Sequence, residues 1–374
     1  MSIQLKEVTT KSDLKKFICF QFELYKGNKY WVPPLIFDEF KTLSKEKNPA
    51  FDFCEAKYWL AYNNNKIVGR IAGIINKSYN ERWNQKAARF GWIDFIDDAE
   101  VFKSLMNELE KWAKEKGMEK IHGPLGFTDF DGEGMLIEGF EELSTFGSIY
   151  NYPYYPKHME INGFEKDVDW IEYSVNVGST IKEKIARIAD EVAKRNNLHL
   201  LKVKKSKEML PYAREIFYVI NKAYKPLYGF VELTDKQIDM YVKAYFGFIK
   251  PDYVPVILDE QNRVVAFGIT MPSLSVAMQK CNGSLFPFGF IHVLKAMRNN
   301  PYADLYLTAV LPELQNKGVN AMLINEMNKV FIRNKITKVE TNRELELNSK
   351  IQAQWRFFDS RLHKRRRCYE KRLD

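Results

Sequence analysis

The stretch "LPELQNKGVNAML" at 311–323 follows an apolar strand-like run at 305–310 and leads into a segment with helical spacing. Apolar side chains recur at Val319, Leu323 and Met327, one face of a helix. Between the two elements lie Pro312, several polar residues and Gly318. A plain strand-to-helix connection needs less polar backbone than this, so the stretch predicts a loop that holds a ligand.

Two halves of the chain repeat one pattern. Each half has a strand, a polar turn and an amphipathic helix, followed by a hairpin, and the matching segments are 5–27 with 200–224 and 58–76 with 253–271. The hairpin turns at Asn65 and Asn262 lie 197 residues apart, and Gly69 and Gly268 stand in the second strands. A near-constant offset indicates an internal duplication. Polar sequence near 176–198 predicts a boundary between domains 1–177 and 178–374.

Length and composition predict a soluble protein of two domains. The chain has 374 residues, 45% hydrophobic and 28% charged, with no apolar window near membrane-span length and no signal-peptide core. Four isolated cysteines indicate reduced thiols and a cytoplasmic location. The cysteines and histidines show no metal-ligand spacing, so we expect no metal. The net charge of +9, concentrated in "RLHKRRRCYEKRLD", favours anionic partners, but no aromatic-interleaved basic motif predicts nucleic acid.

The element order and the loop resemble the GNAT superfamily of N-acetyltransferases. Gln315, Asn316, Lys317, Gly318 and Val319 fit the first five positions of its Q/R-x-x-G-x-G/A signature, and Asn320 replaces the usual small residue. The resemblance implies an α/β fold with a mixed α+β sheet, in two GNAT-like pseudo-repeats.

The same resemblance implies an acyl-CoA site in the second half. A helix start offers free N–H groups and partial positive charge to a pyrophosphate, and Gly318 permits close approach. The strand end at Val310 and Leu311 would hold the pantetheine arm. Lys317, Lys329 and Arg333 would add positive charge for the 3′-phosphate. An ordinary capped helix after a strand is the alternative.

The corresponding stretch of the first half, "FIDDAEVF", predicts no CoA binding. Asp97, Asp98 and Glu100 occupy the helix start, where they suit an N-terminal cap and would repel a pyrophosphate.

Longer stretches resemble a group of bacterial tandem GNAT-like proteins, some associated with N-acylation of sphingoid bases. The stretches that carry this resemblance are 90–140, 150–170 and 345–373. It implies the tandem fold and gives a hint about the substrate.

Catalytic residues are harder to predict. The GNAT pattern N-x-x-(small)-x-x-x-Y would begin at Asn348, but the tyrosine position falls on Trp355, which cannot protonate a thiolate. Tyr369 is the candidate replacement. Glu346 and Asn348 would orient acceptor or cofactor, or serve as a solvated acid and a helix cap.

Two stretches of the first half are candidates for an acceptor site. "FTDFDGEG" would place Asp129 and Asp131 on one strand face, where a carboxylate suits a cationic amine and a general base. A surface acidic loop is the alternative. "YNYPYYP" at 150–156 would wall a pocket or pack at a domain interface.

The segment 273–300 interrupts the second half and has no evident counterpart in the first. Its Met and Phe side chains would pack against the other domain, line a channel for a long acyl chain or touch a membrane. The apolar residues are Leu274, Met278, Phe286, Phe288, Phe290, Leu294 and Met297.

The sequence therefore predicts an N-acyltransferase that moves an acetyl or longer acyl group from CoA to a small-molecule or lipid amine, with peripheral membrane contact as a further expectation. Two alternatives stay open. One is a Fem-like aminoacyl transferase that uses charged tRNA, and the other is a non-catalytic CoA-binding protein.

Overall fold

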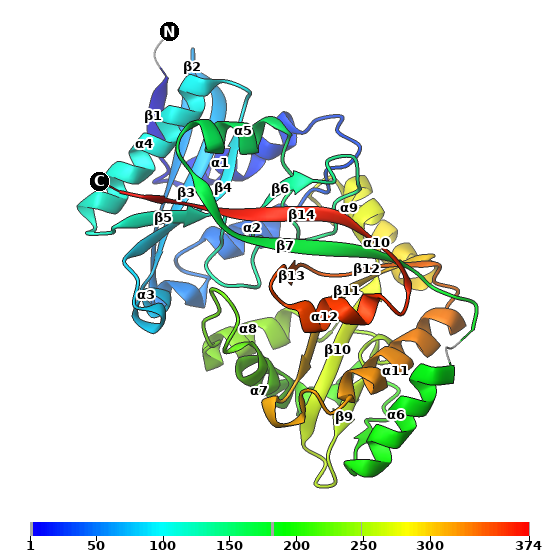
Figure 1. The fold of residues 1–374 in the computed structure, drawn as a ribbon. Helices are drawn as coiled ribbons and strands as arrows, with labels where there is room; N and C mark the ends of the chain where they lie inside the picture. Colours follow the sequence, from blue (N-terminus) through cyan, green and yellow to red (C-terminus); the bar gives the residue numbers. More distant parts are fainter. Residues whose placement is uncertain (1–2, 181–182, 248, 374) are drawn as a thin grey trace.

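The computed structural model describes residues 3–180, 183–247 and 249–373, and it contains two repeats with the same order of elements (Figure 1). The first repeat comprises β1 (Gln4–Glu7), α1 (Lys11–Leu24), α2 (Ile36–Leu43), β2 (Cys54–Asn63), β3 (Lys66–Asn76), α3 (Lys77–Trp83), β4 (Ala87–Phe95), α4 (Ala99–Glu115), β5 (Lys120–Gly123), β6 (Met135–Glu138), α5 (Tyr154–Ile161) and β7 (Glu165–Asn176).

The second repeat comprises β8 (His199–Leu200), α7 (Ala213–Tyr224), α8 (Asp235–Tyr245), β9 (Val256–Leu258), β10 (Val264–Pro272), α9 (Ser275–Cys281), α10 (Gly289–Arg298), β11 (Tyr302–Val310), α11 (Val319–Arg333), β12 (Lys338–Glu340), β13 (Glu344–Leu345), α12 (Ser349–Trp355) and β14 (Asp359–Arg372). Helix α6 (Glu183–Arg195) connects the repeats. The predicted duplication is confirmed by this element order.

The repeats exchange their last strands within one continuous sheet. The strand order is β1-β2-β3-β4-β5-β14-β7-β12-β11-β10-β9-β8. Strand β14 of the second repeat therefore pairs with β5 of the first, and β7 of the first pairs with β12 of the second. Figure 1 shows β7 and β14 side by side between the two halves. The boundary at 177/178 stays a prediction along the chain, but each half of the sheet is completed by a strand from the other.

In both repeats a central strand has a register shift against one neighbour and diverges from the other, parallel neighbour. The ladder between β3 and β4 shifts register between Arg70 and Ala72, and the ladder between β10 and β11 shifts between Ile269 and Thr270. Only three of the nine residues of β4 pair with β5, and only three of the nine of β11 pair with β12. Each repeat therefore has parallel strands that separate beyond the bulge.

Helices cover both faces of the sheet. In the first repeat α4 packs on one face with a core that includes Leu105, and α1 packs with Phe17 in a second core cluster. A side chain at Gly69 would lie 2.9 Å from Leu105, and one at Gly268 would lie 3.2 Å from Met327 of α11. The equivalent glycines thus mark where the long helix of each repeat crosses the central hairpin.

The segment 273–300 forms α9 and α10, and the prediction that it has no counterpart is wrong in part. The short helix α3 occupies the same place between the hairpin and the central strand of the first repeat. Only α10 and the loop before it are additional. Within the described residues, no helix combines the length and apolar character that crossing a membrane requires.

Candidate functional site

The loop between β11 and α11 is held by backbone contacts at both ends. Leu311 N donates to Val265 O at 2.9 Å, and 312–314 form a 3-10 turn. Asn316 and Gly318 have φ values of +63° and +85°. This left-handed backbone favours glycine and asparagine, which explains the residue types of this polar stretch.

The start of α11 carries no acidic side chain and no side-chain cap. The predicted Asn316, Lys317 and Asn320 side chains are exposed there, and Val319 is buried in the core below. Gln315 turns back instead, and its amide donates to Val310 O at 3.1 Å. A helix start of this kind presents backbone N–H groups and partial positive charge to an anion.

The corresponding helix start in the first repeat is closed to an anion. The Asp98 carboxylate caps α4 by accepting from the N–H groups of Glu100 and Val101. Asp97 was predicted to cap as well, but it pairs with His158 at 2.8 Å. Glu100 occupies the second helical position of α4, as Asn320 does in α11.

Helix α6 supports the loop of the second repeat from one side. A side chain at Gly318 would lie 2.9 Å from the Val192 side chain, and Arg195 donates to Lys317 O at 3.1 Å. Gly318 is therefore required by packing as well as by its backbone angle. Lys329 and Arg333 lie farther along α11 and pair with Glu326 and Asp252, so the predicted positive charge near the helix start rests on Lys317.

The two diverging strand pairs differ in what lies against them. In the first repeat the backbone of Phe95 in β4 already has hydrogen-bond partners. Tyr155 Oη accepts from its N–H, and Tyr154 Oη donates to its carbonyl. The stretch 150–156 thus packs in core clusters of the first repeat. Trp355 of the equivalent helix α12 packs beside Tyr173 of β7.

Asp304 lies on β11 beside the bulge and is 3% exposed. Burial and the nearby Glu340 carboxylate raise its pKa to about 7, and hydrogen bonds from Ser273 and Tyr306 moderate the shift. Tyr306 Oη lies 3.4 Å from Asp304 Oδ2. A carboxylate that titrates near neutral pH can accept a proton from an amine.

Glu340, on the neighbouring strand β12, stays ionised. Burial raises its pKa, but Lys364 and His363 outweigh this effect and lower it to about 2. Thr145 Oγ1 also donates to Glu340 Oε1 at 2.7 Å. The fixed negative charge of Glu340 is one reason why Asp304 holds its proton to near neutral pH.

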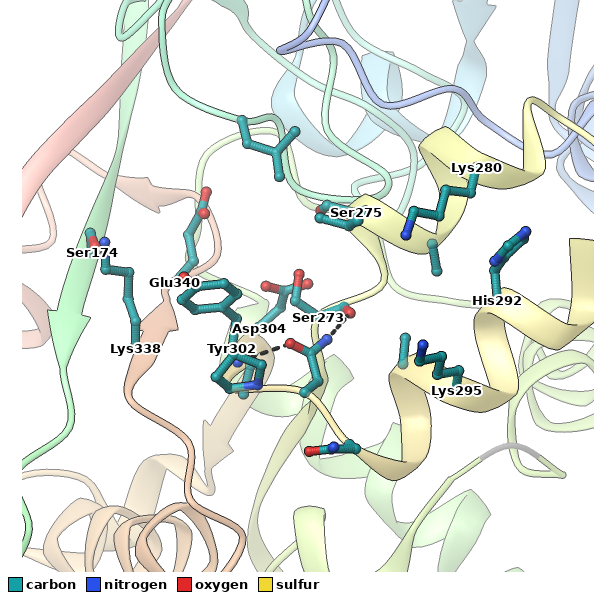
Figure 2. Close-up of a pocket in the computed structure, with 18 of the residues that line it drawn as sticks. Ser174, Ser273, Ser275, Lys280, His292, Lys295, Tyr302, Asp304, Lys338 and Glu340 are labelled. Carbon is teal, nitrogen blue, oxygen red and sulfur yellow. Dashed lines mark hydrogen bonds between the residues drawn. The ribbon is translucent and has the colours of Figure 1, made fainter.

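A pocket of about 420 Å³ opens beside these carboxylates. Figure 2 shows Asp304, Glu340 and Ser273 on one side of it and Lys280, His292 and Lys295 of α9 and α10 on the other. The volume falls within the usual range for small-molecule sites. Helices α9 and α10 of the second repeat therefore form one wall of a pocket whose opposite wall carries the titratable Asp304.

The acidic stretch at 128–133 lies outside this pocket. It forms turns, so the predicted strand with Asp129 and Asp131 on one face is wrong. Asp131 accepts from the N–H groups of Phe127 and Thr128 and stabilises its own loop. Burial raises the pKa of Asp129 to about 6, and of Glu133 to about 7. Glu133 faces Arg343 of the second repeat at 3.9 Å, so this stretch bridges the repeats.

The other predicted catalytic residues have structural roles. Tyr369 is buried in the core of the first repeat and pairs with Gly123, because β14 crosses to that half. Glu346 forms an ion pair with Lys166 at 2.5 Å. Asn348 caps α12, its side chain accepting from Ile351 N. The structure therefore does not bring these residues together with the loop at 311–320.

Asp304, Tyr306 and Glu340 were not among the residues predicted from the sequence. A signal was present in the sequence, because Asp304 is an acidic residue in the otherwise apolar strand that leads into the loop. Glu340 belongs to a short strand that only the fold places beside it.

The absence of a metal stays a prediction. The structure brings together two groups of side chains close enough to share an ion: His122, Asp167 and Cys368, and Glu172, Glu340 and His363.

Comparisons with known proteins identify relatives along most of the chain. No family model matches it. Protein YghO of Escherichia coli (strain K12) is 30% identical over 97% of this chain and 94% of its own. Bacterial ceramide synthase of Caulobacter vibrioides is 27% identical over 77% of this chain and 74% of its own.

Solved structures show the same fold at low sequence identity. A tandem GNAT protein from the clavulanic acid biosynthesis pathway is 10% identical, with a TM-score of 0.56 over 100% of this chain and 99% of its own. A GCN5-related N-acetyltransferase from Sphaerobacter thermophilus is 9% identical, with a TM-score of 0.54 over 99% and 96%. The chain thus has the tandem GNAT fold and belongs to the same protein family as YghO.

Proposed function

We propose that the protein is an acyl-CoA-dependent N-acyltransferase whose second repeat binds the acyl donor. The observation that carries this proposal is the asymmetry of the two helix starts. The α11 start has no cap and no acid, whereas α4 is capped by Asp98 and followed by Glu100. The fold alone would permit a donor in either repeat.

The donor would lie along the open side of β11. Backbone N–H groups at Gly318, Val319 and Asn320 would bind the pyrophosphate, and Lys317 would add positive charge. The pantetheine arm would follow the strand from Val310 towards the bulge, where β11 no longer pairs with β12. This path leads the thioester towards the end of the strand that carries Asp304.

The acceptor amine would enter from the pocket formed with α9 and α10. Asp304 would remove a proton from the ammonium group, and the freed nitrogen lone pair would attack the thioester carbonyl. Collapse of the tetrahedral intermediate would break the C–S bond and form the amide, and the second proton released from the nitrogen would pass to the departing CoA sulfur. Tyr306, hydrogen-bonded to Asp304, would position the carboxylate for this step.

The relative named a ceramide synthase favours a lipid amine as acceptor. Ceramide is an amide of a long-chain amine, so its formation is N-acylation. The pocket wall from α9 and α10 includes apolar Val276 and Ala277 next to Lys280, which suits an amphiphile better than a highly charged acceptor.

A transfer assay tests the proposal. Acetyl-CoA, octanoyl-CoA and palmitoyl-CoA would each be incubated with short polyamines and with a long-chain amino alcohol, and both free CoA thiol and amide product would be measured. We expect amide formation that depends on Asp304. CoA binding without amide formation from any of these amines would instead support a non-catalytic CoA-binding protein.

A further inference from the structure

The outward face of α10 and the loop before it expose large apolar side chains. Two phenylalanines in the loop are 79% and 69% exposed, and three residues of the helix are 40–51% exposed. The five residues are Phe286, Phe288, Phe290, Ile291 and Leu294, and we refer to them as the α10 apolar face. An apolar cluster of this kind on a surface commonly marks an interaction site.

The opposite face of α10 is fixed to the protein. Val293, Ala296 and Met297 pack against a core cluster that contains Leu274 and Met278. The predicted packing of this segment is thus confirmed for the inward residues, since the same cluster includes Val32 of the first repeat. The predicted acyl channel receives no support from Phe286 and Phe288, because both side chains point outward into solvent.

Positive charge borders the α10 apolar face, because Lys295 and Arg298 follow Ile291 and Leu294 by one helical turn. The segment 273–300 contains Lys280, Lys295 and Arg298 and no aspartate or glutamate. All three basic side chains are exposed. An amphipathic helix with aromatic residues on one face and lysine or arginine at its margin is typical of helices that lie in a membrane interface.

We propose that the α10 apolar face docks on an anionic phospholipid bilayer. The phenylalanines would enter the boundary between headgroups and acyl chains, while Lys295 and Arg298 would contact anionic headgroups. The exposed charge of the segment 273–300 is only positive, which favours this partner over a neutral protein surface. The proposal does not depend on the acyltransferase activity.

Docking would also place the pocket beside the membrane. His292, Lys295 and Ala296 of α10 line the pocket, next to the exposed Ile291 and Leu294. If the proposed acyltransferase function holds, an amphiphilic amine could reach Asp304 while its hydrocarbon chain stays in the bilayer.

Vesicle co-sedimentation of the full chain tests the docking surface. The vesicles would contain either phosphatidylcholine alone or equal parts of phosphatidylcholine and phosphatidylglycerol. We expect binding to the anionic vesicles that weakens as salt increases, and a partition coefficient at least about tenfold lower for Phe286→Ser/Phe288→Ser. Each basic residue near an anionic surface contributes about fivefold, so Lys295→Glu/Arg298→Glu should lower the coefficient more than tenfold.

Matched variants elsewhere control for general loss of apolarity or charge. Ile161→Ser/Leu347→Ser removes two side chains that are 81% and 82% exposed, and Lys111→Glu/Lys114→Glu reverses two exposed lysines on α4. Both should bind vesicles as the parent does, with thermal melting confirming that every variant is folded.

Three outcomes would overturn the proposal. One is failure of the parent to bind anionic vesicles, and another is equal loss of binding in the control variants. The third is a dimer in size-exclusion chromatography that Phe286→Ser/Phe288→Ser dissociates, which would assign the face to a second copy of the chain. None of these outcomes bears on amide formation from soluble amines.

Discussion

Asp304→Asn separates the proposed chemistry from stability, because the two respond to this substitution in opposite directions. Burial raises the pKa of Asp304 to about 7, whereas the carboxyl of an unfolded chain has a pKa of about 3.9. Between these values the folded protein binds a proton that the unfolded chain has released. The free energy of unfolding therefore falls as pH rises from about 4 to about 7. Above about pH 7 this loss is complete.

The size of the effect follows from the two pKa values. Each pH unit in this window changes the free energy of unfolding by about 1.4 kcal/mol per proton. Asparagine cannot ionise, so from pH 5 to pH 8 Asp304→Asn should gain about 3 kcal/mol relative to the parent. With an unfolding entropy of about 2.1 cal/mol/K per residue, this corresponds to a relative shift in Tm of about 4 °C.

Thermal melts of parent and variant at pH 5 and pH 8 measure this shift, and initial rates of amide formation measure the chemistry. For the parent, kcat/KM should rise with pH through about 7 as Asp304 loses its proton. Asp304→Asn should lower kcat by about 10²–10⁴-fold, the usual contribution of a general base.

Asp129→Asn is the comparison, because burial raises the pKa of Asp129 to about 6 although it lies outside the pocket. It should change the pH dependence of stability without a comparable loss of rate. A parent-like rate in Asp304→Asn, or a larger loss in Asp129→Asn, would refute the assignment of the base.

Three further substitutions test the helix starts. Asn320→Glu copies Glu100 of the first repeat and should weaken CoA binding by about 2 kcal/mol, or about thirtyfold in Kd, through repulsion of the pyrophosphate. Calorimetry measures this change, with Asn320→Gln as the control. Unchanged affinity of Asn320→Glu for CoA would mean that the loop is only a helix start. Asp98→Ala should cost about 1 kcal/mol of stability through loss of the α4 cap and leave the Kd for CoA unchanged. Weaker CoA binding by this variant would indicate that the donor binds in the first repeat and not in the second. Gly318→Ala should lower Tm, because the new side chain would meet Val192 at 2.9 Å in a left-handed backbone; a Tm equal to that of the parent would contradict this packing.

The local features of the loop between β11 and α11 could be predicted from the sequence. Turn residues, a strand end and an acid-free helix start are all encoded within the stretch 311–323. The duplication could also be predicted from local sequence, because both hairpins carry a glycine in the second strand. Gly69 and Gly268 mark equivalent crossings of a helix over a hairpin. Tertiary packing was not needed to find either feature.

The position of Tyr369 could not be predicted from the sequence, because it depends on the exchange of β7 and β14. Tyr369 follows the second repeat in the chain, yet its strand completes the sheet of the first. Periodicity along one strand cannot indicate such a crossing, because antiparallel partners are chosen by contacts distant in sequence. The raised pKa of Asp304 was not evident for a related reason, since it depends on burial in the fold and on Glu340 of a different strand.

Hydrogen–deuterium exchange of the full chain with and without CoA tests the central claim most directly. The N–H groups at the start of α11 have no side-chain cap, so bound pyrophosphate should slow their exchange. We predict protection across 316–323 on addition of CoA and no change across the equivalent 96–103 at the start of α4. Protection of α4, or none at α11 at CoA concentrations that saturate binding, would contradict the assignment of the donor site to the second repeat.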